Sequence, residues 1–143
     1  YFLQQGHPML SDDKVATLLH EDQFWAVPSH PHHRPFRQFE VLGDPVNQFA
    51  TAPGPIHAFY VLEAGEPDDA IAIEEVLGFR KFEQLLPNYL FGFDFLIEQR
   101  MAWLAQLAGR SRVFRIRRPW SLLRQSEVYE AICAHSRAIT LPN

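Results

Sequence analysis

Residues 93–119 constrain the fold most strongly, because a helical pattern there is followed directly by a strand pattern. In FDFLIEQRMAWLAQLAGR (residues 93–110) apolar side chains recur at helical spacing, and we expect one buried face made of Phe95, Leu96, Met101, Leu104, Leu107 and Ala108. Gly109 is the expected C-terminal cap of this helix. The following residues, SRVFRIRRP, alternate in polarity as a strand does. A helix that leads directly into a strand is typical of layered α/β folds.

The rest of the chain changes repeatedly between strand and helix patterns. Strands are expected at Phe24–Ser29, Ile56–Ala64 and Ala70–Glu75, and the second should be buried on both faces because it is apolar throughout. HEDQ (residues 20–23) reads as a turn, and helices are expected within residues 76–91 and 121–135. Residues 30–55 contain five prolines and predict a long loop, with one helical turn around Phe39–Leu42. We therefore expect an α/β fold with a mixed sheet packed with helices, forming a single domain over residues 1–143.

Composition argues against several classes of function. The formal net charge is −4, so the chain as a whole offers no electrostatic case for binding nucleic acid. No apolar run approaches the length of a membrane-spanning helix, and no membrane association is expected. The single cysteine, Cys133, excludes an intramolecular disulfide framework and fits a reducing compartment. These features predict a cytoplasmic protein.

Two adjacent aspartates, Asp12 and Asp13, interrupt the apolar stretch HPMLSDDKVATLL, which we expect to form a strand. Like charges resist sharing one site, so this pair costs free energy unless a cationic group lies close to it. Acidic residues at the carboxyl end of a strand are where α/β enzymes hold Mg²⁺ and polar substrates. The structural alternative is a solvated turn in which Ser11 or Asp12 caps the chain.

The order of these segments resembles HPr kinase/phosphorylase-like proteins, a family of P-loop kinases, over nearly all of the chain. The specific motif is LSDD within FLQQGHPMLSDDKVATLL, and the matching layout continues through IHAFYVLEAGEPDDAIAIEE, VLGFRKFEQLLPN and VFRIRRPWSL. The resemblance implies part of an ATP-dependent phosphotransferase that acts on a hydroxyl of a peptide, a protein or a small molecule. It implies Asp12 as the general base and Asp13 as the partner of Mg²⁺, two roles that could be exchanged. In this interpretation Arg117 and Arg118 are the candidate anion contacts, and ATP and Mg²⁺ are cofactors of the parent protein.

The chain departs from this family in its phosphate-binding residues. No G-x-x-x-x-G-K-[ST] loop occurs in the sequence, and neither of the two lysines, Lys14 and Lys81, follows a glycine. We therefore expect the C-terminal part of a larger P-loop kinase domain, inactive alone, in which YFLQQG is the last turn of the P-loop helix and Gly6 caps it. Such a part would leave a sheet edge uncovered, so we expect a homo-oligomer.

Two other functions remain open. A non-enzymatic α/β interaction module would use the arginines of residues 110–118 or the loop rich in proline and histidine to hold a partner. The structural alternative for the arginines is an edge strand protected by charge. A small metal-binding protein would use His30, His32 and His33 to hold Zn²⁺ or Ni²⁺, although an exposed polar loop is the plainer interpretation.

Overall fold

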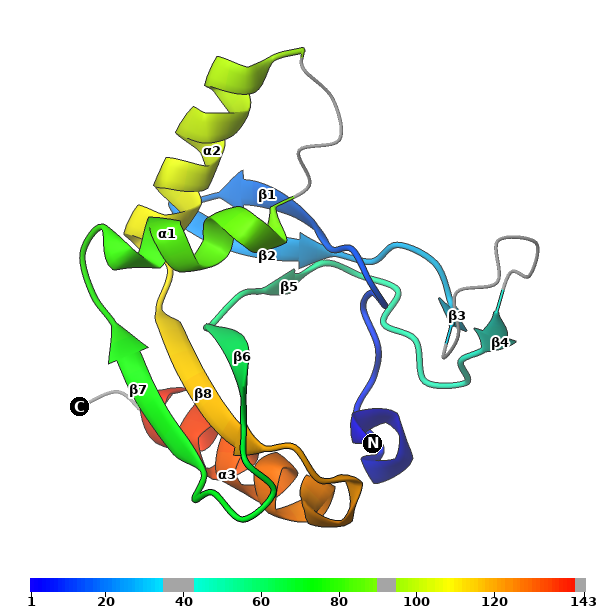
Figure 1. Cartoon of the computed structure of the whole chain (residues 1–143). Coiled ribbons are helices and arrows are strands. Elements are labelled where there is room, and N and C mark those ends of the chain that lie inside the picture. Colours follow the sequence, from blue (N-terminus) through cyan, green and yellow to red (C-terminus); the bar gives the residue numbers. More distant parts are fainter. Residues whose placement is uncertain (35–42, 90–94, 141–143) are drawn as a thin grey trace. The chain divides into compact units, whose positions relative to one another are not determined.

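The computed structural model describes residues 1–34, 43–89 and 95–140 (Figure 1). The chain divides into two compact units, Tyr1–Ile56 and His57–Asn143, which are described separately below. The expected helical turn at Phe39–Leu42 lies outside the described residues. Strands and helices occur together, which confirms the mixed α/β class, whereas the single domain expected over residues 1–143 stays a prediction.

The described residues of the second unit contain a three-stranded sheet in the order β6-β8-β7. β8 (Val113–Pro119) runs parallel to β6 (Phe59–Gly65) and antiparallel to β7 (Ala72–Val76), so the sheet is mixed, as expected. The three strands expected in this unit are confirmed to within a few residues. The edge position considered for β8 is wrong, because β8 lies between the two other strands and its Val113, Phe114 and Ile116 are buried.

β6 is the strand whose burial the sequence predicted incorrectly. It was expected to be buried on both faces, but it forms one edge of this sheet, and its first three residues are half-buried while the next three, including Leu62, are exposed. One face of the sheet packs against α3 (Gln125–Thr140), where the Tyr60 hydroxyl and His135 Nδ1 are hydrogen-bonded at 2.8 Å. The Phe114 ring lies 4.5 Å from the imidazole of His135 in an edge-to-face arrangement.

The helices of the second unit begin and end close to their expected positions. α1 (Arg80–Leu85) continues into a 3-10 turn, η2 (Leu86–Asn88), which contains Pro87, and α1 packs against α2 (Ile97–Arg110) (Figure 1). Before α3, β8 is followed by a second 3-10 turn, η3 (Leu122–Arg124). In the described part of the chain, no helix has the length and apolar character that crossing a membrane requires.

The apolar face of α2 is confirmed in its second half and wrong at its start. Leu104, Leu107 and Ala108 are buried, whereas Phe95 and Leu96 are exposed because α2 begins only at Ile97. Gly109 lies inside the helix, which ends one residue later and is followed by Ser111 as C-cap, whose N–H donates to the Leu107 carbonyl.

The first unit is built from hairpins. β1 (Ala16–His20) and β2 (Gln23–Val27) are antiparallel and joined by Glu21 and Asp22, whose φ values of 48° and 63° give the turn that matches the twist of a two-residue hairpin. β2 also pairs with β5 (Gly54–Pro55). The turn predicted at HEDQ is confirmed.

The chain start and the second hairpin complete this unit. The first residues form a 3-10 helix, η1 (Phe2–Gln5), and Gly6 caps it in the left-handed conformation, as the sequence predicted for a helix end. β3 (His32–His33) pairs antiparallel with β4 (Asp44–Pro45). Gly43 has a φ of 100°, and a Cβ at this position would lie 2.7 Å from the His33 carbonyl oxygen, so only glycine fits beside β3.

We expect Leu104→Ala to lower the free energy of unfolding by about 2–5 kcal/mol, because Leu104 is 1% exposed and its loss leaves a cavity in the core. The matched control is Leu123→Ala, since Leu123 is 94% exposed, and we expect a change within about 0.5 kcal/mol. Denaturant titration followed by circular dichroism measures both. Equal losses for the two variants would contradict the assigned core.

Candidate functional site

The sequence predicted that Asp12 and Asp13 lie in a strand, and this prediction is wrong. β1 begins at Ala16, and the two aspartates form a bend before it. The Asp12 carboxylate is held in this bend by two hydrogen bonds. The candidate site is built around this carboxylate.

Both oxygens of Asp12 form hydrogen bonds with the end of β3 and the residue that follows it. Oδ1 lies 2.9 Å from Nδ1 of His33, and Oδ2 accepts the backbone N–H of Arg34 at 2.9 Å. The Asp12 side chain is only 15% exposed, whereas that of His33 is 42% exposed. The contact joins residues that lie 21 positions apart, so it fixes the bend against the second hairpin.

The surroundings of Asp12 lower its pKa below the ordinary value of 3.8. Burial of the carboxyl alone would raise the pKa, but the Arg34 N–H, the hydrogen bond to His33 and the positive charge of His33 and His30 outweigh it. Asp12 is therefore a carboxylate at neutral pH, fixed in direction by two donors.

Backbone hydrogen bonds hold the segments around this bend. The Met9 N–H donates to the Gln48 carbonyl, and the Ala50 N–H donates to the Met9 carbonyl, both at 2.9 Å. The Val46 N–H donates to the Pro31 carbonyl at 2.9 Å. Three separate stretches of the first unit are thereby fixed to one another.

Asp13 differs from its neighbour in being exposed, and in the described residues its carboxylate takes part in no hydrogen bond or ion pair. Its oxygens are the hard ligands that Mg²⁺ prefers. However, residues 1–34, 43–89 and 95–140 contain no group of three or more His, Cys, Asp or Glu side chains arranged to hold a metal ion. Asp13 alone would supply one carboxylate ligand.

The three histidines of the loop have different surroundings. His33 is engaged with Asp12, whereas Nδ1 of His30 and Nδ1 of His32 are buried with no hydrogen-bond partner among the described residues. The rings of His30 and His32 have centroids 6.2 Å apart. The sequence treated the three imidazoles as equivalent metal ligands, and the structure separates His33 from the other two.

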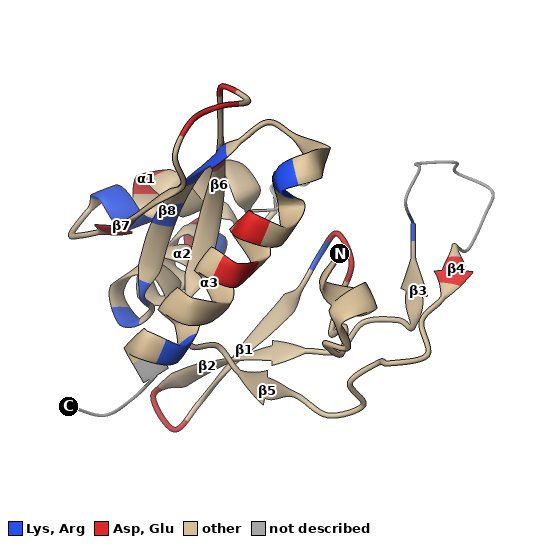
Figure 2. Cartoon of the chain, turned by 90° about the horizontal axis from the view of Figure 1, so that it is seen from below, with Lys and Arg blue, Asp and Glu red and all other residues tan. Residues whose placement is uncertain are grey.

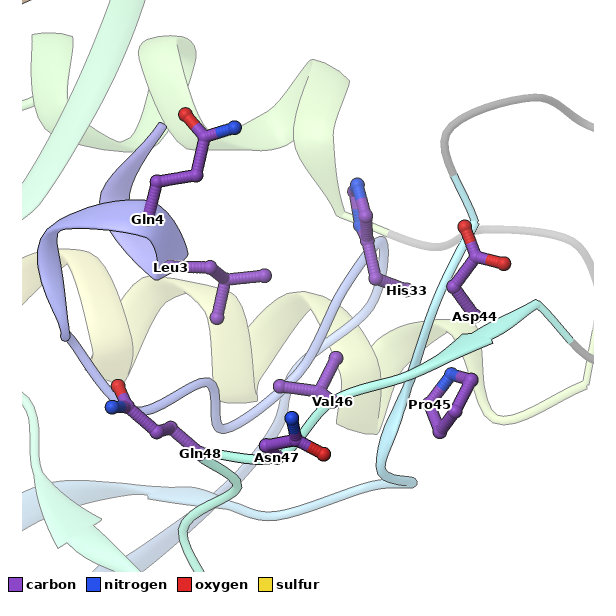
Figure 3. Close-up of a pocket in the computed structure, with 8 residues that line it drawn as sticks. All are labelled: Leu3, Gln4, His33, Asp44, Pro45, Val46, Asn47 and Gln48. Atoms are coloured by element: carbon purple, nitrogen blue, oxygen red, sulfur yellow. The ribbon is translucent and has the colours of Figure 1, made fainter.

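A pocket of about 330 Å³ opens beside His33 (Figure 3). η1 contributes Leu3 and Gln4, and the β3–β4 hairpin contributes His33, Asp44 and Pro45. The segment after β4 completes the lining with Val46, Asn47 and Gln48. Sequence reasoning did not find this pocket, because its residues come from three stretches with no shared pattern.

Arg117 and Arg118 belong to the second unit, on β8. Arg117 forms an ion pair with Asp69 at 2.8 Å, and the Arg118 guanidinium lies 4.9 Å from the ring centre of Trp120. The other arginines of this strand pattern also have acidic partners: Arg112 with Glu75, and Arg115 with Glu63 and Glu74. Figure 2 shows Lys and Arg positions in blue on β8.

No protein-family model, curated protein or solved structure matches this chain.

We expect Asp12→Asn to destabilise the protein by about 1 kcal/mol at neutral pH, because the amide cannot replace the charged acceptor of His33 and Arg34. The folded-state pKa of Asp12 is depressed, so its contribution is present above pH 3.8 and is lost as the pH falls through the folded-state value. Urea titrations at neutral and at strongly acidic pH measure this, and the two proteins should converge in acid. Asp13→Asn is the matched control, because Asp13 is exposed. A penalty for Asp12→Asn that persists unchanged in acid would contradict this role of the charge.

Proposed function

We propose that this chain is part of an HPr-kinase-like, ATP-dependent phosphotransferase acting on a hydroxyl group. The observation that carries the proposal is the Asp12 carboxylate, which is ionised and held by His33 and Arg34 beside the exposed carboxylate of Asp13. The LSDD motif that the resemblance depends on thus contains one fixed and one accessible acid.

The proposed role of Asp12 is to accept the proton of the substrate hydroxyl. Phosphoryl transfer needs mainly positioning and neutralisation of charge, so an ionised carboxylate with a fixed direction suits the orientation of an incoming hydroxyl. Its two protein hydrogen bonds leave further lone pairs on both oxygens for that contact. Asp13 is the proposed ligand of Mg²⁺, which when bound would neutralise phosphate charge.

These residues do not form a binding site for the nucleotide that the proposed reaction needs. The 143 residues contain no phosphate-binding loop, and Lys81 donates its ammonium hydrogen bond to the Ser111 carbonyl at 2.9 Å. Arg117, proposed from the sequence as an anion contact, has Asp69 as its partner. ATP binding is therefore proposed to depend on residues outside these 143.

We expect Asp12→Asn to lower phosphoryl transfer by the whole protein about 10²–10⁴-fold, the usual contribution of a positioned general base. The measurement follows ³²P from [γ-³²P]ATP with Mg²⁺ to a panel of serine, threonine and tyrosine peptides and of neutral polyols. The matched control is Asp22→Asn, because Asp22 lies in the β1–β2 turn at positive φ, a conformation that asparagine also adopts.

Transfer that depends on Asp12 and not on Asp22 supports the proposal. Transfer that Asp12→Asn leaves unchanged contradicts the role of this carboxylate. A whole protein that transfers no phosphoryl group to any acceptor of the panel contradicts the proposed class of function.

A further inference from the structure

The pocket beside His33 lies within the first unit, and its chemistry differs from that of a phosphate site. No lysine or arginine is among the described residues that line it, and the exposed carboxylate of Asp44 stands at its rim. Phosphate sites depend on cationic side chains or on converging backbone N–H groups, and a carboxylate repels an anion. The pocket therefore favours a neutral ligand.

His33 presents a hydrogen-bond acceptor to this pocket. The Asp12 carboxylate has only acceptor atoms, so Nδ1 of His33 is the donor in their 2.9 Å contact. In a neutral imidazole the other nitrogen, Nε2, then keeps its lone pair. Since the His33 side chain is 42% exposed and lines the pocket, this lone pair can accept a hydrogen bond from a ligand O–H or N–H in place of water.

The remaining polar lining consists of side-chain amides. The side-chain amides of Gln4, Asn47 and Gln48 form no hydrogen bond with other described residues, and each amide offers both donors and an acceptor. Such groups match hydroxyls, which also donate and accept. Most of the pocket surface is apolar, and the side chains of Leu3 and Val46, which point toward the middle of the view in Figure 3, provide a surface for C–H groups.

We propose that this pocket binds a neutral polyol of about the size of a monosaccharide, with one hydroxyl donating to Nε2 of His33. The volume of about 330 Å³ lies at the lower end of the range for small-molecule sites, which suits a single small ring rather than a nucleotide. The pocket stands on its own geometry, whereas the identification of this polyol as the phosphoryl acceptor rests on the proposed function. In that case His33 would contact the substrate while its Nδ1–H holds Asp12, the proposed base.

The test is a titration of the whole, ¹⁵N-labelled protein with D-glucose, D-ribose and myo-inositol, followed through the side-chain amide signals of Gln4, Asn47 and Gln48. We expect at least one polyol to shift these signals saturably with a Kd of about 10 mM or tighter. Tetrahydropyran, a ring without hydroxyls, and inorganic phosphate should shift none of them. Failure of all three polyols, or an equal response to tetrahydropyran, would overturn the proposal.

Gln4→Leu removes one amide without touching the Asp12–His33 contact and should weaken polyol binding about tenfold. Gln5→Leu is its matched control, because Gln5 is the next residue of η1 and does not line the pocket. Equal affinity in the two variants would also overturn the proposal. Polyol binding without Asp12-dependent phosphoryl transfer would leave the pocket standing and contradict the proposed function, and the reverse result would contradict the pocket alone.

Discussion

The contact on which the candidate site depends is the one between Asp12 and the segment at His33 and Arg34. A carboxylate followed by a second carboxylate needs compensation, and here the imidazole and a backbone N–H provide it. The same contact fixes the bend against the β3–β4 hairpin, which gives the pocket beside His33 one of its walls. The interaction that compensates the Asp12 charge is therefore also the one that holds His33 at the pocket. A change that removes the Asp12 charge affects both the stability of the first unit and the direction of His33.

In the second unit, charged side chains of β8 are also paired with side chains of opposite charge. This strand lies in the middle of the sheet, and its Arg115 and Arg117 side chains are exposed, so they face solvent and meet acidic side chains of neighbouring segments. Parallel pairing with β6 places Glu63 near Arg115, antiparallel pairing with β7 adds Glu74, and Arg117 reaches Asp69. The cations of this strand are used largely within the unit.

Much of the local structure could be predicted from the sequence, because local causes determine it. Gly6 ends η1, HEDQ forms the turn of the first hairpin, and helical spacing identifies the buried half of α2. The position of β8 and the partner of Asp12 could not be predicted, because both depend on pairing between distant residues. The sequence HPHH does not distinguish His33 from the neighbouring histidines. His33 differs from them in the folded chain, where it pairs with Asp44 in the hairpin and contacts Asp12. The pocket could not be predicted either, because its lining residues are distant in the sequence.

The most direct test of this account is the tautomer of His33, measured by long-range ¹H–¹⁵N NMR of the imidazole at alkaline pH, where imidazoles are neutral. The account predicts that Nδ1 carries the proton that it donates to Asp12 and that Nε2 is unprotonated and available to a ligand hydroxyl. The opposite tautomer, with the proton on Nε2, would show that Asp12 does not accept a hydrogen bond from His33. That result would contradict the site as described here, including the orientation of the residue that lines the pocket.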